Sequence, residues 1–169
     1  MRKFLNALYD GAASLAALFM VLMLVMVLLS ILGRELGFHV RGTDAYAGYF
    51  MAASGFLALA HTLKKGEHIR VTLLVTKLKG LPQKALEVWA LFAATALACI
   101  AAFYSGKLAW QSYQFNDMST GNDATPLWIP QLSMAVGTLI LAIAFLDELV
   151  MELRGKRVQA SSSESLHNE

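Results

Sequence analysis

Four histidines are the residues of this 169-residue chain best suited to hold a metal or a haem, and they are His39, His61, His68 and His167. A haem held between membrane helices needs histidines on facing helices at matching depth. Only His61 falls within a long apolar block, so the spacing does not predict a haem site. We expect His61 and His68 to play polar roles near a membrane surface.

Other chemistry-bearing residues do not form a recognised catalytic pattern. The sequence contains no P-loop, no HExxH and no evident Ser/His/Asp set. Its single cysteine, Cys99, lies inside an apolar block, which excludes an intramolecular disulfide and a thiolate metal cluster. We therefore expect no enzymatic activity, no metal and no cofactor. The formal charge of +2 is too small to indicate a nucleic-acid partner.

Apolar residues make up 57% of the chain and collect in four blocks almost free of charge. Each block has roughly 20 residues, enough for a helix to cross a hydrocarbon core of about 30 Å. Helices satisfy their own backbone hydrogen bonds, as a lipid environment requires. We predict an all-α integral membrane protein whose single domain covers residues 1–158. Its four transmembrane helices are expected at about residues 11–33, 44–63, 83–110 and 126–150.

Basic residues divide unequally between the two sides of such a protein. Eleven fall in the N-terminus, the middle loop and the C-terminal tail: Arg2, Lys3, Lys64, Lys65, Arg70, Lys77, Lys79, Lys84, Arg154, Lys156 and Arg157. The other three are Arg34, Arg41 and Lys107. Because cytoplasmic segments carry the excess of lysine and arginine, we predict that both termini and the middle loop are cytoplasmic.

The segments between the blocks carry further expectations. Residues 67–79 repeat polar side chains at helical spacing, which favours an amphipathic helix at the cytoplasmic interface. Thr125 is expected to cap the last span with Pro126 at its first position, and Pro130 to bend its start. Residues 159–169 are typical of a disordered tail.

Small residues predict where helices contact one another, because they let backbones approach closely in lipid. One such stripe in the second span consists of Ala45, Gly48, Ala52 and Gly55, and another in the third span of Ala94, Ala98 and Ala101.

Charge is absent from the middles of all four predicted spans. Carriers that couple ions themselves usually keep ionisable residues near the bilayer centre, so an autonomous carrier is not expected. The polar residues of the outer loops have two readings, either ordinary anchors and solvated turns or contacts with another subunit. These residues are Arg34, Arg41, Asp44, Lys107, Asp117, Ser119 and Asp123.

Two longer motifs resemble those of a known family. Residues 56–71, FLALAHTLKKGEHIRV, and residues 118–131, MSTGNDATPLWIPQ, resemble the small membrane subunit of tripartite ATP-independent periplasmic (TRAP) transporters, the DctQ-like family. Arg34, Met134 and Gly137 match further family positions. The resemblance assigns structural roles to Gly66, Glu67, His68, Gly121, Pro126, Trp128, Pro130 and Gln131. Many relatives carry a paired acid at the start of the second span, whereas here Asp44 is followed by Ala45.

The resemblance implies a multi-pass subunit in the bacterial inner membrane, embedded in the lipid bilayer. Its implied partners are a large DctM-like permease subunit, which moves an organic acid with sodium, and a periplasmic substrate-binding protein. The small subunit would support the scaffold of the large one and help dock the binding protein. Two alternatives remain open: a membrane anchor of a quinone-linked or haem-containing oxidoreductase, and a self-assembling channel.

Overall fold

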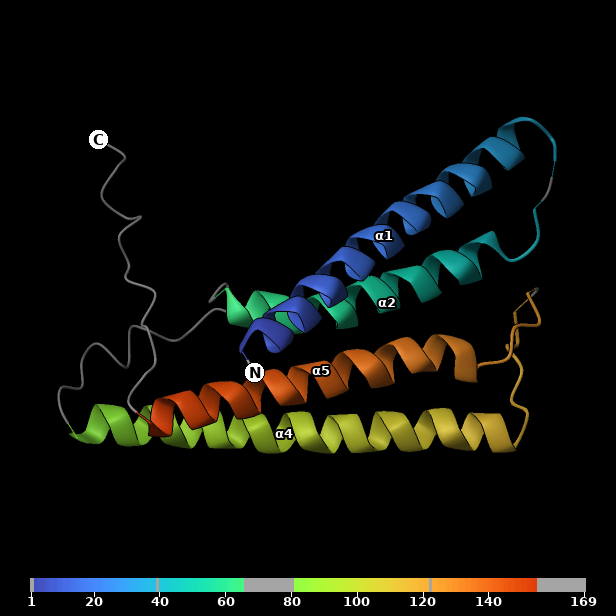
Figure 1. Cartoon of the computed structure of the whole chain (residues 1–169). Helices are drawn as coiled ribbons and strands as arrows, with labels where there is room; N and C mark the ends of the chain where they lie inside the picture. The colour runs from blue at the N-terminus through green and yellow to red at the C-terminus, as the bar shows by residue number, and fades with distance from the viewer. Residues whose placement is uncertain (1, 39, 66–80, 122, 155–169) are drawn as a thin grey trace, which may run out of the picture.

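The computed structural model describes residues 2–38, 40–65, 81–121 and 123–154. Across these residues the chain forms the helices α1 (Arg2–Glu35), α2 (Thr43–Lys64), α4 (Leu81–Gln114) and α5 (Trp128–Leu153) (Figure 1). The described part contains no β-sheet, and a lone bridge joins Met118 to Pro126. The predicted all-α class is confirmed for this part of the chain. The expected interfacial helix at residues 67–79 and the tail at 159–169 lie outside it.

Three of the described helices are long and apolar enough to cross a membrane, namely α1, α4 and α5. Their qualifying segments are Leu5–Glu35, Ala85–Gln114 and Trp128–Leu153. The 22-residue α2 does not reach the same hydropathy. Its tyrosines, its serine and its terminal charges dilute the apolar residues.

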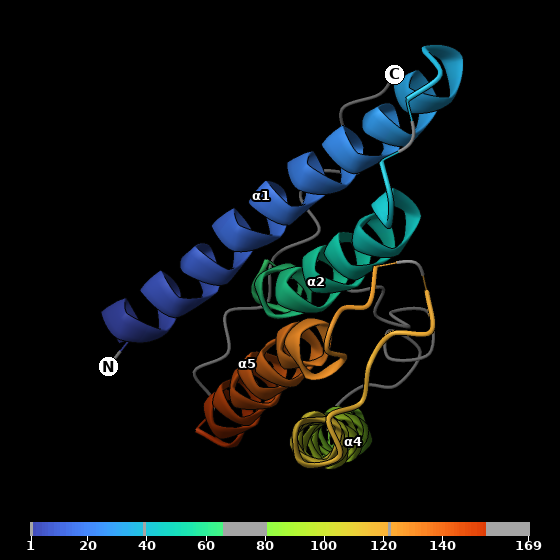
Figure 2. The same cartoon turned by 90° about the vertical axis from the view of Figure 1, so that its right-hand side faces the viewer.

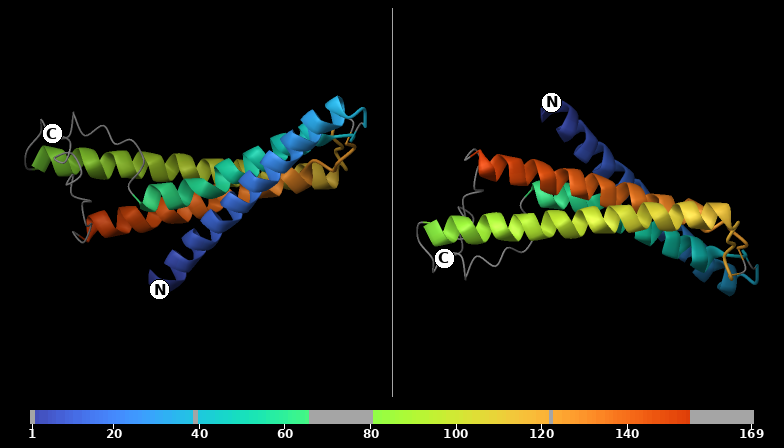
Figure 3. Two further views of the ribbon diagram at one scale, coloured as in Figure 1. Left: turned by 90° about the horizontal axis from the view of Figure 1, so that it is seen from above. Right: turned by 90° about the horizontal axis from the view of Figure 1, so that it is seen from below.

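The helices form a single row rather than a closed bundle. α1 packs against α2, α2 against α5, and α5 against α4, so that α1 and α4 are the edges (Figure 2). Helices that follow one another in the chain run in opposite directions (Figure 1). Figure 3 shows α1 crossing α2 obliquely. A row leaves both of its faces and both edge helices open to the surroundings.

The start of α5 differs from the sequence prediction. The helix begins at Trp128, its N-cap is Leu127, and no side chain caps it, so the expected Thr125 cap and the start at Pro126 are wrong. Pro130 is the third residue of α5. The first four N–H groups of a helix have no partner within it, so a proline there removes no helical hydrogen bond and does not force a bend.

Small side chains allow the close contact between α1, α2 and α5. Tyr9, Ala12 and Ala16 of α1 meet a cluster contributed by the other two helices, consisting of Leu57, Ala60, Leu63, Ile140 and Ala144. The pair α4–α5 is closed along one stripe of α4 by Leu91, Thr95, Ala98, Ser105, Ala109 and Ser112. Thr95 and Ser105 donate hydrogen bonds to carbonyls of their own helix, which satisfies these hydroxyls without water.

The predicted small-residue stripes are used only in part. Within the described chain, Gly48, Ala52 and Gly55 of α2 are exposed, and nothing approaches the open side of either glycine. In the α4 stripe Ala98 is buried but Ala101 is exposed. The close contact of α2 is instead with Gly137 of α5, whose backbone lies against Phe56. In lipid, apolar pattern alone does not say which small-residue face meets a neighbour.

Candidate functional site

The loop between α4 and α5, which the sequence predicts to be an outer loop, is closed on itself by backbone hydrogen bonds. Outer and inner refer to the two sides of the membrane as the sequence predicts them. The Ser119 N–H donates to the Thr125 carbonyl at 2.8 Å, and the Leu127 N–H donates to the Asp117 carbonyl at 2.9 Å. Asn116 (φ 52°) and Ala124 (φ 46°) adopt left-handed backbone at the two corners. These hydrogen bonds give the described residues of the loop a folded backbone.

The Asp123 carboxylate attaches this loop to α2. The Tyr49 hydroxyl lies 3.0 Å from Asp123 Oδ2, and the Ser119 hydroxyl donates to Asp123 Oδ1 at 2.8 Å. A hydrogen bond from Thr125, followed by those from Ser119 and Tyr49, lowers the pKa of Asp123 to about 2. The hydroxyls of Thr125 and Tyr46 are 3.2 Å apart and add a second connection to α2. We call Tyr49, Ser119, Asp123 and Thr125 the outer latch.

Two glycines leave room for the outer latch. A Cβ at Gly42, which has φ 80°, would lie 2.8 Å from the Cβ of Asp123. A Cβ at Gly121 would lie 2.7 Å from Asp123 Oδ1, and the Gly121 N–H donates to Ser119 Oγ at 3.2 Å. Any larger residue at either position would push the Asp123 side chain out of place.

Aromatic rings gather at the same end of the row. Trp128 meets Tyr113 edge-to-face with ring centroids 5.7 Å apart, and Tyr113 is 6.1 Å from Trp110. Such rings are typical of the headgroup level of a bilayer. Near them, the side-chain oxygen of Gln131 is buried without a hydrogen-bond partner among the described residues.

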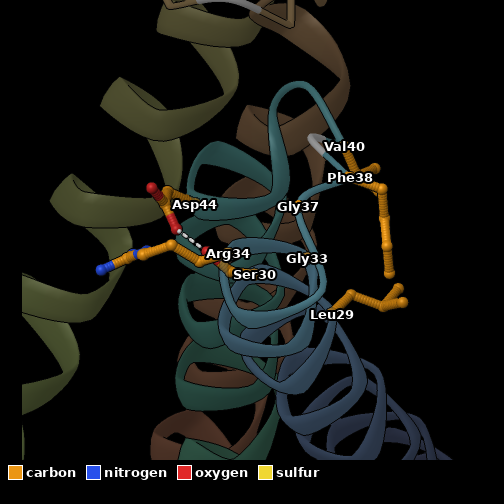
Figure 4. Close-up of a pocket in the computed structure, with 8 residues that line it drawn as sticks. All are labelled: Leu29, Ser30, Gly33, Arg34, Gly37, Phe38, Val40 and Asp44. Carbon is orange, nitrogen blue, oxygen red and sulfur yellow. Dashed lines mark hydrogen bonds between the residues drawn. The ribbon is translucent and has the colours of Figure 1, made fainter.

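A shallow pocket of about 300 Å³ lies between the outer ends of α1 and α2 (Figure 4). Ser30 donates a 3.0 Å hydrogen bond to Asp44 at its wall. Gly33 is required there, because a Cβ would lie 2.6 Å from the Phe38 carbonyl oxygen. Figure 4 shows the Arg34 guanidinium extending away from Leu29 and Phe38.

The structure brings together some of the outer residues singled out in the sequence. Ser119 and Asp123 share the outer latch, and Asp117 contributes its carbonyl to the loop. Arg34 and Asp44 line one pocket. Arg41, Lys107 and Asp117 are exposed. The motif residues Gly66, Glu67 and His68 lie outside the described residues.

A polar cluster at the opposite end of the row was missed by the sequence reading. Lys64 of α2 forms a 3.0 Å ion pair with Asp147 of α5, and its Nζ lies 5.0 Å from the centre of the Tyr9 ring. His61 Nδ1 is 3.6 Å from Asp10 Oδ1 on α1. The sequence did hold a signal for this contact, because Lys64 follows the second apolar block and Asp147 follows the fourth. We call Lys64 and Asp147 the inner ion pair.

Among the described residues, no group of three or more His, Cys, Asp or Glu side chains is placed to hold a metal ion. Of the four histidines, the described ranges include His61 alone, since His39, His68 and His167 lie outside them.

Long apolar helices with polar networks at their ends define an integral membrane protein. Comparison with protein families then gives a more specific assignment. The family described as Tripartite ATP-independent periplasmic transporters, DctQ component, matches residues 23–155. The chain belongs to this family, which is a component of TRAP transporters. This confirms the small permease component that the motifs predicted. A search of curated proteins found no match.

Proposed function

We propose that this chain is the small permease subunit of a secondary, sodium-coupled TRAP transporter that takes up organic acids with the help of a periplasmic binding protein. The family match over residues 23–155 is the observation that carries this proposal. The helices supply no ion-coupling site of their own among the described residues, since their charged side chains lie toward the ends of the spans. The subunit therefore acts on transport through its partners.

The large DctM-like subunit is the proposed partner within the membrane. The most apolar stretch of α1 has 6% of its residues buried and that of α4 has 17%, against 28% for α5. A single row of helices thus offers edge surfaces to another membrane protein or to lipid. Packing against the stationary scaffold of the large subunit would widen that scaffold and resist its tilting while a transport domain moves. The exposed α2 stripe of Gly48, Ala52 and Gly55 suits close contact with a partner helix.

We propose that α2 is the fourth span, and that both termini lie in the cytoplasm of a bacterial inner-membrane protein. α2 packs against α1 and α5, and its 22 residues match the length of a transmembrane helix. The distribution of basic residues supports the orientation. In this orientation the outer latch faces the periplasm.

Docking of the binding protein is assigned to the outer surface. Arg34, Arg41 and Lys107 supply exposed positive charge there, and Asp117 supplies exposed negative charge. Asp44, Ser119 and Asp123 already have hydrogen-bond partners within the chain. In this proposal Asp44, Ser119 and Asp123 hold the shape of the outer surface. The exposed charged residues contact the binding protein.

Reconstitution into vesicles tests the proposal. The chain alone should not couple a sodium gradient to uptake of an organic anion, whereas the chain with its large subunit and binding protein should. Sodium-driven uptake by the isolated chain would overturn the assignment. A haem absorption band in the purified chain would instead favour the oxidoreductase anchor.

Charge reversal tests the docking surface. Arg41→Glu and Lys107→Glu should weaken activation by the binding protein while leaving co-purification with the large subunit unchanged. Arg154→Glu, at an exposed position at the opposite end of the row, is the matched control. Uptake unaffected by both outer variants would show that these residues do not take part in docking.

Topology can be read by cysteine labelling after Cys99→Ser. Thr120→Cys and Arg154→Cys place single thiols at exposed positions at opposite ends of the row. In intact cells a membrane-impermeant maleimide should label the first variant and not the second. The reverse pattern would invert the proposed orientation.

A further inference from the structure

A second pocket, of about 220 Å³, lies between α1 and α2 at the end opposite the outer latch. The residues that line it are Asn6, Tyr9, Asp10, His61, Lys64 and Lys65. They come from the first turns of α1 and the last turn of α2, where the apolar stretches of both helices give way to polar residues. Such a position is the headgroup level of a membrane.

The pocket carries charge of both signs. The side chain of Asp10 is 72% exposed, and its Oδ1 lies 3.6 Å from His61 Nδ1. A carboxylate can accept several hydrogen bonds, so this contact leaves room for another donor. The Lys64 ammonium is engaged by Asp147 and the Tyr9 ring, whereas Lys65 is exposed at the rim.

This pattern is complementary to a zwitterion that carries a phosphate and a hydrogen-bonding ammonium. Lys65 and the Asn6 amide can donate to phosphate oxygens, and Asp10 can accept from an ammonium. An anionic headgroup without an ammonium would meet the Asp10 carboxylate as a like charge. A trimethylated choline carries positive charge but has no N–H to donate. Exposed Ala17, Val21 and Leu24 continue along the same face of α1 toward the centre of the span and supply surface for acyl chains.

We propose that this pocket is a binding site for the headgroup of a phosphatidylethanolamine-type lipid, with the phosphate at Lys65 and Asn6 and the ammonium at Asp10. The ammonium would add a second partner to the Asp10 carboxylate, which lies at the edge of an apolar span. Its occupancy would join the inner ends of α1 and α2. The proposal is independent of the transport function, because it depends on the membrane surface alone.

Lipid binding to the purified, delipidated chain tests the proposal by native mass spectrometry and by thermal shift in detergent. Phosphatidylethanolamine should bind and raise the Tm, whereas phosphatidylcholine and phosphatidylglycerol should bind about tenfold more weakly. Equal binding of phosphatidylethanolamine and phosphatidylcholine would overturn the site. Inorganic phosphate is added in a separate arm, and full stabilisation by phosphate alone would show a simple anion site instead.

Two variants localise the effect. Asp10→Asn should abolish the preference for ethanolamine over choline, and Lys65→Gln should weaken binding of all three phospholipids. Asp117→Asn, the same change at an exposed carboxylate at the other end of the row, should leave binding unchanged. Retention of the ethanolamine preference in Asp10→Asn would place the lipid elsewhere.

Discussion

Gly137 of α5 lies against the backbone of Phe56 of α2. A Cβ built on Gly137 would be 2.6 Å from both the carbonyl carbon and the carbonyl oxygen of Phe56. Atoms of a main chain cannot rotate away as a side chain can, so α2 and α5 leave no room for a side chain at this point. The contact fixes the separation of α2 and α5, and the positions of their neighbours follow from it.

Gly137→Ala should separate these helices and lower stability. Overpacking of this kind costs about 1–3 kcal/mol, which a thermal unfolding scan in detergent would report as a fall of several degrees in Tm. Gly106→Ala is the matched control, because nothing lies within 4 Å of a Cβ at that position. Alanine favours helix over glycine by about 1 kcal/mol, so the control should be neutral or stabilising. An unchanged Tm in Gly137→Ala would contradict the close contact.

Removal of the Tyr49 hydroxyl should loosen the outer loop without unfolding the helices. Tyr49→Phe takes away one partner of the Asp123 carboxylate while keeping the ring. Amide hydrogen exchange at Ser119 and Leu127, the donors that close the loop, should become about five- to tenfold faster. Tyr104→Phe removes an exposed hydroxyl from α4 and should leave both amides protected. Equal exchange in the two variants would mean that Tyr49 does not hold the loop.

The outer latch should also depend on pH in a defined direction. The pKa of Asp123 is lowered from 3.8 to about 2, first by the Thr125 hydrogen bond and then by those from Ser119 and Tyr49. A carboxylate with a lowered pKa in the folded state stabilises that state fully above its unfolded pKa, and the stabilisation is lost as pH falls through the folded value. Loop amides should therefore stay protected down to about pH 4 and lose protection toward about pH 2.

Isotope labelling of aspartate side chains would measure this titration directly by NMR in detergent. Thr125→Val should move the Asp123 midpoint upward toward its ordinary value, because the principal hydrogen bond is gone. Asp123→Asn serves as the control and should flatten the pH dependence of the loop amides. A midpoint near 3.8 in the unmodified chain would contradict the hydrogen-bond arrangement.

The inner ion pair should behave as a partly buried interaction. The side chains of Lys64 and Asp147 are 30% and 20% exposed, so loss of one partner leaves a half-buried charge in place. Lys64→Met should cost about 1–3 kcal/mol in thermal unfolding, whereas Lys107→Met at an exposed site should cost little. The exchange Lys64→Asp with Asp147→Lys should restore part of the loss. Recovery would be incomplete, because the exchanged pair forfeits the contact with the Tyr9 ring. A double variant no more stable than Lys64→Met would show that the pair does not act as one unit.

The sequence alone determined the helical, membrane-spanning character and the family of this protein. Long runs of apolar residues can satisfy their backbone in lipid only as helices or closed barrels, so length and composition suffice for that inference. The motifs at residues 56–71 and 118–131 carried the DctQ assignment, which the family match over residues 23–155 confirms. Charge placement also showed that the middles of the four predicted spans are free of ionisable residues.

Only the tertiary structure decided which helices are neighbours and which polar residues meet. Tyr49 and Asp123 are 74 positions apart in the chain, and Lys64 and Asp147 are 83 apart, so no local pattern joins them. The α2 stripe of Gly48, Ala52 and Gly55 looked like a helix contact and is exposed, whereas Gly137 makes the close approach. The reason is physical: a face that packs on lipid and a face that packs on a helix are both apolar, so hydropathy cannot distinguish them. The face that contacts a neighbouring helix is the one whose backbone packs closely against it. This packing depends on how the helices are arranged in three dimensions.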